Sequence, residues 1–185
     1  ELMYTYDKLF SGYNHTVAQI LLTGEDVDHE ERRTNFENTM YRLLELGALP
    51  VINENDSVST TEIMHNGTFG DNDTLSALVA VLAKADGLIL LTDIDGLYTA
   101  DPHKDPNAQL LSFVNKITDD IRALGGGSAG SQGTGGMATK LHAAEICLDA
   151  GCDMIITNGT KTYILKKEEG GYKFIDSAPK YRDML

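Results

Sequence analysis

The sequence predicts an α/β domain built on a parallel sheet. Its clearest strand is Leu88 to Leu91, an unbroken apolar run that is typical of a strand covered on both faces. Similar short apolar runs alternate with segments of helical periodicity, as in strand, helix, strand crossover units. Two of the runs lead directly into acidic residues, and ligands of open α/β sheets bind beyond the carboxyl ends of the strands. We therefore expect the functional residues at that edge of the sheet.

The composition argues against several classes of partner. The 185 residues are 42% hydrophobic and 23% charged, which suffices for one domain with a sizeable core. A net charge of -13 argues against nucleic acid and anionic membrane surfaces. No apolar run approaches the ~18 residues of a membrane span, and nothing at Glu1 resembles a signal peptide. We expect a cytoplasmic protein without a nucleic-acid or membrane partner.

The cysteines and histidines form no recognisable site. Cys147 and Cys152 lack the C-x-x-C spacing of redox and zinc motifs and are expected to be buried thiols. The histidines include no H-x-x-x-H pair, so we expect no zinc site.

The first part of the chain is expected to supply one acidic strand end. The predicted elements are the end of a helix at residues 2–10, a strand at 17–22, a charged helix at about 28–46 and a strand at 49–52. Gly47 stands where a glycine commonly ends a helix. The last of these strands runs directly into Asn53, Glu54, Asn55 and Asp56.

A second acidic group precedes the helix predicted from the apolar spacing at residues 75–82. Asp71, Asn72 and Asp73 lie at the N-terminus of this helix, where carboxylates and Asn are favoured as caps. Capping accounts for one acid there, but not readily for two acids and an Asn. We therefore expect at least one of them to serve a site.

The strand at residues 88–91 leads to a third polar end, Thr92 and Asp93. Residues 60–69 have no clear period, and we interpret them as a hairpin or a lid over the site. The rest of the chain predicts an edge strand at 110–114, a helix at 118–124, a helix at 137–150, a strand at 153–157 and a hairpin around residues 170–171.

A glycine-rich loop precedes the helix at residues 137–150. Residues 125–136 hold seven glycines, and glycines before a helix N-terminus let backbone N–H groups approach an anion closely. Lys140 lies in the first turn, where the helix dipole disfavours a cation, so an anion is expected beside it. We interpret the loop as a phosphate-binding element, with a flexible linker as the alternative. It is neither a Walker A loop nor a G-x-G-x-x-G motif.

Together these groups describe acids on one side of a cleft and a phosphate pocket on the other. The acids would recognise an amine or hydroxyls, and the pocket a polyphosphate, with Mg2+ shielding the charge between them. Phosphoryl transfer depends mainly on positioning and charge neutralisation, which an aspartate that orients lysines and helix ends aimed at phosphates can supply. No Ser-His-Asp order or nucleophilic cysteine motif competes with this interpretation.

Four motifs follow one another along the chain, at residues 51–57, 70–77, 90–102 and 133–140. They closely resemble motifs of the amino acid kinase family, and within that family those of the kinases that act on L-glutamate. The resemblance runs from about Glu1 to Gly159. It implies a three-layer α/β/α sandwich with a mainly parallel sheet. It also implies transfer of the γ-phosphate of ATP, with Mg2+, to the side-chain carboxylate of L-glutamate, the first step of proline biosynthesis. Family members commonly form dimers or tetramers, so a homo-oligomer is expected, while feedback inhibition by proline stays open.

The resemblance assigns roles to residues within the matching motifs. Asn53, Asp56, Asp71 and Asn72 would bind glutamate, with the carboxylate of Asp56 as partner for its ammonium group. Asp73 and Lys140 would be catalytic, Asp73 by orienting lysines and Lys140 by stabilising charge on the moving group. The residues that would meet the nucleotide are Thr92, Asp93, Thr134, Gly135, Gly136, Met137, Ala138, Thr139 and Lys140. No residue is assigned to a metal.

Two features of the family are missing from the sequence. Members begin with a strand carrying a Lys and a glycine turn, then a second strand ending in Ser-Gly-Ala, and both would precede Glu1. The tail after Gly159 lacks a Gly-Thr-x-Phe ending, and nothing resembles the C-terminal RNA-binding-like domain, of PUA type, that many members append. We therefore expect residues 1–185 to be a partial amino acid kinase domain, incomplete at the N-terminus. Whether such a fragment is active by itself stays open.

Two other functions stay open at this point. One is another kinase of the same family, acting on acetylglutamate, aspartate, carbamate or a nucleoside monophosphate; the motifs at residues 53–56 and 70–76 favour glutamate. The other is a non-catalytic module that binds an amino acid or a nucleotide and regulates another protein. The first would turn over a different acceptor, and the second would bind its ligand without turnover.

Overall fold

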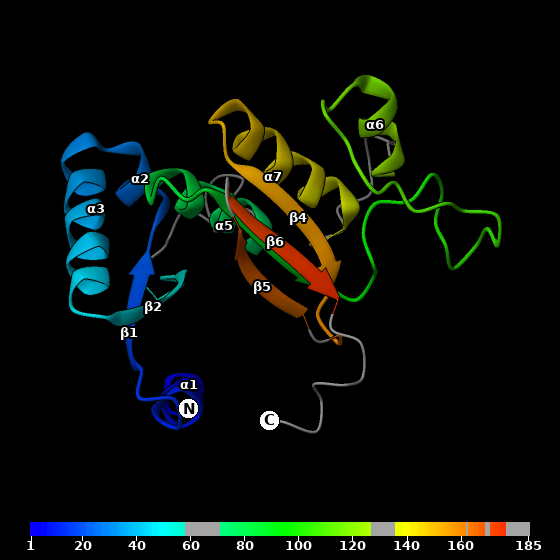
Figure 1. Ribbon diagram of the computed structural model, residues 1–185. Coiled ribbons are helices and arrows are strands. Elements are labelled where there is room, and N and C mark those ends of the chain that lie inside the picture. Colours follow the sequence, from blue (N-terminus) through cyan, green and yellow to red (C-terminus); the bar gives the residue numbers. More distant parts are fainter. Residues whose placement is uncertain (58–70, 127–135, 162, 169–170, 177–185) are drawn as a thin grey trace. The chain divides into compact units, whose positions relative to one another are not determined.

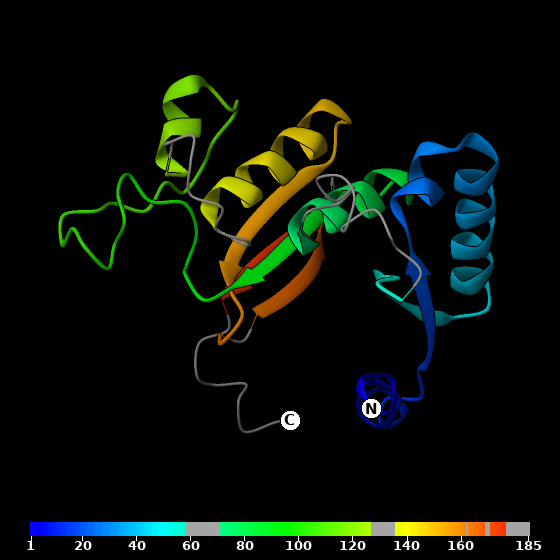
Figure 2. The same cartoon turned by 180° about the vertical axis from the view of Figure 1, so that it is seen from behind.

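The computed structural model describes residues 1–57, 71–126, 136–161, 163–168 and 171–176. The chain divides into two compact units, of which the first contains residues 1–88 and 116–154 and the second residues 89–115 and 155–185. Figures 1 and 2 show the ribbon from opposite sides. The predicted lid at 60–69 and most of the predicted glycine loop lie outside the described residues.

The first unit begins with helix α1 (Leu2–Ser11) and contains two neighbouring strands, β1 (Thr16–Leu22) and β2 (Ala48–Glu54). The strands are parallel, and the register pairs them residue for residue along their whole length. The parallel strands that the sequence predicts are therefore confirmed, and with them the α/β class.

Two helices, α2 (Gly24–Asp28) and α3 (Glu30–Glu45), connect these strands. The sequence predicted one charged helix in this segment, opened by Thr23, and the structure corrects this by dividing the segment into two helices. Helix α2 begins where the Asp26 carboxylate accepts hydrogen bonds from the backbone N–H and the hydroxyl of Thr23, each at 2.7 Å, which stabilises a helix start. Helix α3 ends just before Gly47, as predicted. The φ of this glycine is +71°, a backbone conformation that glycine adopts without strain because it has no Cβ.

The core of the first unit joins β1, β2, α3 and α5 (Asn72–Leu82). Leu22, Phe36 and Leu75 are buried at its centre. The partly buried apolar residues that pack around them are Ile20, Val27, Met40, Ile52, Leu78, Val79 and Leu82. Because Ile52 ends the apolar part of β2 and Leu75 lies in the first turn of α5, one cluster supports both predicted acidic ends.

Helix α5 also packs against α7 (Met137–Asp149). Ala77 on α5 and Ala143 on α7 are fully buried, and such small side chains let helices approach closely. Helix α6 (Asp119–Leu124) contacts α7 in turn, through an ion pair between Arg122 and the α7 side chain Glu145. This packing holds the first turns of α5 and α7 near each other.

The two cysteines flank the end of α7. Cys147 and Cys152 are both buried and neither forms a disulfide, which confirms the prediction of buried thiols. Burial raises the pKa of the Cys147 thiol to about 12, so the thiol is neutral and unreactive near neutral pH.

Strands β3 (Gly87–Thr92) and β4 (Asp153–Asn158) form a second two-stranded sheet. The first N–H of β4 donates to the carbonyl of Asp86 at 3.2 Å, and the N–H of Gly159 donates to the last carbonyl of β3 at 2.8 Å. One bond joins the starts of the two strands and the other joins their ends, so the strands are parallel.

The burial of β3 differs from the prediction. Leu90 is buried, but Leu91 is 65% exposed. Successive side chains of a strand point to opposite faces, so β3 is covered on the face of Leu90 and not at Leu91. The expectation of a strand covered on both faces is wrong at this position.

A third sheet pairs β5 (Tyr163–Glu168) with β6 (Gly171–Asp176) in antiparallel register, which confirms the hairpin predicted around residues 170–171. The edge strand predicted at 110–114 is wrong, because Leu110 forms only an isolated bridge with Tyr98. The chain beyond it is not held in a ladder, and Phe113 is 80% exposed. Among the described helices, none has the length and apolar character that a membrane crossing requires.

Candidate active site

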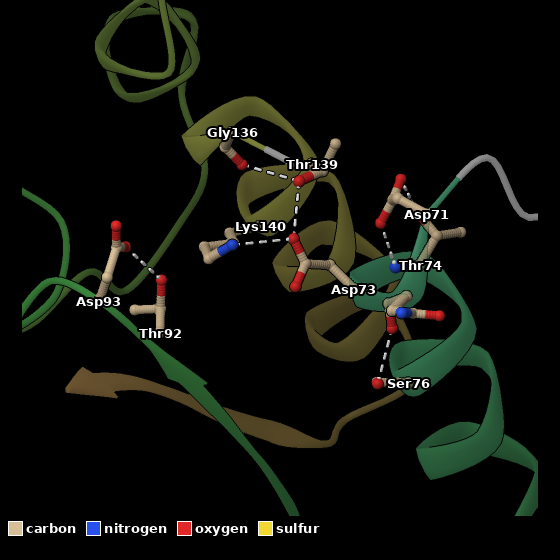
Figure 3. A network of polar contacts seen from close by, with 10 residues as sticks. Asp71, Asp73, Thr74, Ser76, Thr92, Asp93, Gly136, Thr139 and Lys140 are labelled. Atoms are coloured by element: carbon tan, nitrogen blue, oxygen red, sulfur yellow. Dashed lines mark hydrogen bonds and ion pairs between the residues drawn. The ribbon is translucent and has the colours of Figure 1, made fainter. Parts of the chain in front are cut away.

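The first turns of α5 and α7 carry an ion pair between Asp73 and Lys140. The Lys140 Nζ lies 3.0 Å from Asp73 Oδ2, although the residues are 67 apart in the sequence. Their side chains are only 10% and 17% exposed, for Lys140 and Asp73 respectively. Figure 3 shows the two side chains reaching toward each other from their helices.

Asp73 supplies the anion that the position of Lys140 predicted. A cation in the first turn of a helix is disfavoured by the dipole, and a carboxylate beside it offsets that cost. The same carboxylate lies in the first turn of α5, where a negative charge is favoured. The pair therefore balances charge at the start of both helices, without excluding a second anion on Lys140, whose ammonium has three donors.

The hydroxyl of Thr139 also reaches Asp73. Thr139 Oγ1 lies 2.6 Å from Asp73 Oδ2 and 2.7 Å from the carbonyl oxygen of Gly136. Both of these oxygens are acceptors and the hydroxyl has one hydrogen, so it donates to one of them at a time. Asp73 Oδ2 is thus held by residues from the first turn of α7, as the dashed lines in Figure 3 show.

Helix α7 begins without a capping side chain from its own N-cap residue. That residue is Gly136, which has no side chain to accept from the backbone N–H groups of the first turn, whereas Asp71 and Thr118 cap α5 and α6. Backbone N–H groups in the first turn of a helix lack intrahelical partners and can bind an anion. Of the predicted nucleotide contacts, Gly136, Met137, Ala138, Thr139 and Lys140 lie at this helix start, while Thr134 and Gly135 fall outside the described residues.

Asp71 is the N-cap of α5. Its Oδ1 accepts from the backbone N–H of Thr74 at 2.8 Å, and its Oδ2 accepts from the Thr74 hydroxyl at 3.1 Å. Thr74 itself is buried, so this carboxylate holds the turn that presents Asn72 and Asp73. The capping role that the sequence allowed for one of the two acids thus falls to Asp71, and the side chain of Asn72 is exposed.

The end of β2 carries the other predicted substrate residues. Asn53 and Asp56 are both exposed, and the Asn53 Oδ1 accepts from the N–H of Glu54 at 2.9 Å. The chain leaving the strand is held by a hydrogen bond from the N–H of Asn55 to the carbonyl of Leu22 at 2.7 Å. Among the described residues, no hydrogen bond or ion pair joins Asn53 or Asp56 to Asp71, Asn72 or Asp73. The two groups are connected through the core cluster that includes Ile52 and Leu75.

Thr92 and Asp93 belong to the second unit. The Thr92 hydroxyl donates to Asp93 Oδ1 at 3.1 Å. Asn158 Nδ2 donates to the carbonyl of Asp93 at 3.3 Å. The Asp93 side chain is exposed, so its backbone is held by the protein while its carboxylate stays accessible.

A polar cluster lies beside these two residues, and the sequence interpretation missed its members Asn158 and Lys161. Lys161 Nζ lies 2.7 Å from Asp95 Oδ1, and this hydrogen bond holds the pKa of the Asp95 carboxyl below its ordinary value. Asn158 is the first residue after the strand predicted at 153–157. The rule that selected the other strand ends would therefore have selected Asn158 as well.

No metal-binding cluster is found in the part of the chain that the structure describes: no three His, Cys, Asp or Glu side chains there are grouped to hold an ion.

Comparison with known proteins places these residues in context. Residues 1–158 match the amino acid kinase family. The glutamate 5-kinase of Clostridium acetobutylicum is 49% identical over 178 residues, which cover 94% of this chain and 65% of that protein. The glutamate 5-kinase of Carboxydothermus hydrogenoformans is 51% identical over 176 residues, with 94% and 46% covered. That of Rhodospirillum rubrum is 50% identical over 166 residues, with 90% and 43% covered. The chain thus spans from 43% to 65% of the length of these curated relatives.

Proposed function

The chain belongs to the amino acid kinase family, and on that basis we propose that it forms part of an enzyme that phosphorylates the side-chain carboxylate of L-glutamate with ATP. The products would be L-glutamyl 5-phosphate and ADP. The observation that carries the proposal is the Asp73–Lys140 pair, held by Thr139 at an uncapped helix start. The identity of about half with relatives named glutamate 5-kinase supports the choice of acceptor.

The phosphate side of the reaction would use the first turn of α7. The N–H groups that follow Gly136 would bind phosphate oxygens, since the glycine N-cap offers no side chain to cap them. Lys140 would neutralise the charge that spreads over the transferred group, and Asp73 would hold the ammonium in place. Because Asp73 already fixes the Lys140 ammonium, this positive charge would need no reorganisation during the reaction.

The nucleotide would also contact Thr92 and Asp93. The exposed carboxylate of Asp93 can accept hydrogen bonds from hydroxyl or amino groups of a nucleotide. The Thr92 hydroxyl, which donates to this carboxylate, would orient it. We place no atom of the nucleotide beyond these roles.

Glutamate would be bound by Asn53, Asp56 and Asn72. The exposed Asp56 carboxylate would pair with the substrate ammonium, and the amides would bind the substrate carboxylates. Asp71 would contribute by capping α5, since both of its oxygens already bind Thr74.

Mg2+ would enter with ATP, as is common for this ion, which keeps several waters and binds substrate phosphates. It would reduce the repulsion between the phosphates and the acids of the site. The side chains that would act on the nucleotide directly are Lys140 and Asp93.

The biological setting follows from the chemistry. Phosphorylation of glutamate on its side chain is the entry to proline biosynthesis, so we propose a cytoplasmic biosynthetic enzyme. A homo-oligomer and feedback inhibition by proline belong to this proposal as further expectations, to be measured on the intact protein.

The proposal is tested by Mg2+-dependent release of ADP from ATP. The assay uses the intact protein, with any sequence that adjoins residues 1–185 in its natural gene product, and offers glutamate, aspartate and acetylglutamate separately. We expect turnover with glutamate alone. Turnover with another acceptor would move the assignment within the family, and nucleotide binding without turnover by the folded protein would replace the kinase with a binding module.

A matched pair of lysine variants connects the result to the site. Lys140→Met removes the buried ammonium, whereas Lys104→Met removes an exposed one that pairs with Asp101 at 2.9 Å. We expect turnover to fall by about a hundredfold or more in the first variant and to be unchanged in the second. Equal activity of both variants would contradict the role given to Lys140.

A further inference from the structure

The loop that follows β4 holds the loop that follows β3. We define residues 92–95 as the β3 loop and residues 158–161 as the β4 loop, each counted from the last residue of its strand. Three contacts join them: Gly159 N–H to the Thr92 carbonyl at 2.8 Å, Asn158 Nδ2 to the Asp93 carbonyl at 3.3 Å, and Lys161 Nζ to Asp95 Oδ1 at 2.7 Å. The β4 loop therefore contacts three of the four residues of the β3 loop.

The β4 loop is also stabilised by hydrogen bonds of its own. Asn158 Oδ1 accepts from the N–H of Thr160 at 2.9 Å and from its hydroxyl at 2.7 Å. The Asn158 side chain thus uses its carbonyl within its own loop and its amide nitrogen on the β3 loop. A side chain bonded at both ends transmits the position of one loop to the other.

These contacts leave the functional atoms of the β3 loop open. They fall on the carbonyls of Thr92 and Asp93 and on the side chain of Asp95, and none of them uses the Thr92 hydroxyl or the Asp93 carboxylate. The Asp93 side chain is exposed. The backbone is thereby fixed while the groups proposed to meet the nucleotide remain accessible, which is how a supporting layer of residues fixes a binding site.

We propose that Asn158 and Lys161 are positioning residues that hold Thr92 and Asp93 for the nucleotide. This inference rests on the proposed function, because it assumes that the β3 loop contacts ATP. Asn158 fixes the backbone at Asp93, and Lys161 anchors the far end of the loop at Asp95. Neither residue needs to touch the nucleotide.

The exposure of the ion pair separates this role from general stabilisation. The Lys161 and Asp95 side chains are 41% and 37% exposed, and a pair so accessible to water contributes little to global stability. Its loss should therefore change nucleotide affinity more than the unfolding transition. The Lys104–Asp101 pair is the matched control, since it lies in the same unit at 2.9 Å but joins residues three apart on one loop.

The test measures ATP kinetics and binding of the fluorescent analogue TNP-ATP in the intact protein. For Lys161→Gln we expect the KM for ATP and the Kd for TNP-ATP to rise about two- to fivefold, the range that a half-exposed ion pair supplies. The kcat, the KM for glutamate and the Tm should stay unchanged. Lys161→Arg should restore the nucleotide affinity, because it keeps the charge.

Coupling between the two side chains gives a second readout. If Lys161 acts through Asp95, the double variant Asp95→Asn with Lys161→Gln should bind TNP-ATP no more weakly than either single variant. Asn158→Leu, which keeps the size but not the hydrogen bonds, should raise the KM for ATP in the same way. Lys104→Gln should match the unsubstituted protein in all assays.

The outcomes distinguish this inference from the proposed function. If the unsubstituted protein turns over ATP with glutamate but Lys161→Gln and Asn158→Leu behave like Lys104→Gln, the positioning role is wrong and the kinase stands. A lower Tm with unchanged nucleotide affinity would likewise overturn the role and leave a structural one. If the unsubstituted protein neither binds nor turns over ATP, the proposed function fails and this inference fails with it.

Discussion

Lys140 and Asp73 form an ion pair at 3.0 Å that is almost closed to water, with side chains 10% and 17% exposed. Two charges removed from water cost free energy, and their attraction offsets this cost only while both are present. Removal of one partner should therefore lower the stability of the fold by more than the intact pair contributes to it. Separation of the Lys140 ammonium from the Asp73 carboxylate would therefore cost the fold a large amount of free energy.

The first prediction concerns the loss of that counter-charge. Asp73→Asn leaves the Lys140 ammonium nearly buried without its carboxylate, so we expect the free energy of unfolding to fall by about 3 kcal/mol and the kcat to fall at least about tenfold. Urea unfolding and steady-state kinetics measure the two effects. Asp101→Asn, in an exposed pair with Lys104, should change neither, and equal effects of the two variants would contradict the prediction.

The second prediction isolates the Thr139 hydroxyl. Thr139→Val keeps the β-branched shape and a similar helix propensity but removes the hydrogen bond to Asp73. We expect it to destabilise the protein by about 1.5 to 3 kcal/mol, the value of a hydrogen bond to a charged group, and to lower the kcat. Thr139→Ser retains the hydroxyl and should recover most of both. Failure of serine to recover activity would show that the methyl group matters and not the bond.

The third prediction separates capping from substrate binding at Asp71. Asn is as good an N-cap as Asp, whereas Ala loses the cap at a cost of about 1 kcal/mol. We therefore expect thermal unfolding to detect Asp71→Ala but not Asp71→Asn. If Asp71 acts only as a cap, the KM for glutamate is unchanged in Asp71→Asn. A raised KM in that variant, with normal stability, would restore Asp71 as a direct substrate contact.

The fourth prediction tests the ammonium partner. Asp56 is exposed at the end of β2, so Asp56→Asn should leave the Tm unchanged. It removes the charge proposed to pair with glutamate, and we expect the KM for glutamate to rise about tenfold with the KM for ATP unchanged. An equal rise in both KM values would point to a change in the site as a whole.

The fifth prediction uses the buried thiol of Cys147. Its pKa is raised from 9.0 to about 12 by burial, so above pH 9 the unfolded chain releases this proton while the native chain keeps it. The native state then binds more protons, and its stability falls as pH rises through that window. Urea unfolding from pH 8 upward should show a steeper fall for the unsubstituted protein than for Cys147→Ser. Parallel curves would mean that the thiol titrates alike in both states.

Local patterns predicted most of the elements. The strands at 17–22, 49–52 and 153–157 and the helices at 118–124 and 137–150 appear within a few residues of their predicted bounds, because each has an apolar pattern and a clear start or stop signal. The errors have local causes too. The start of α2 depends on one short turn held by Asp26, and the strand predicted at 110–114 has an apolar pattern but only a single bridge to a partner.

The site was less predictable, because its contacts are long-range. Each helix start was identified from its own residues, but the bond between Asp73 and Lys140 depends on the packing of α5 against α7. The Asp95–Lys161 pair joins two loops in the same way. Charge and spacing along the chain do not encode which residues meet in space. Only the family resemblance implied that Asp73 orients lysines, and nothing indicated the pairing of Asp95 with Lys161.

The packing of α5 against α7 also affects the order in which the protein folds. Each helix can nucleate from its own residues, whereas Asp73 and Lys140 meet only after the 67-residue separation between them has been closed, and long closures carry an entropic cost that precedes the reward of contact. The charge pair therefore belongs to the late, non-local part of the folding reaction. A chain that has formed its helices but not yet docked them would have native-like circular dichroism without the Asp73–Lys140 pair. Regain of the proposed activity should therefore mark the completion of folding more sharply than regain of secondary structure does.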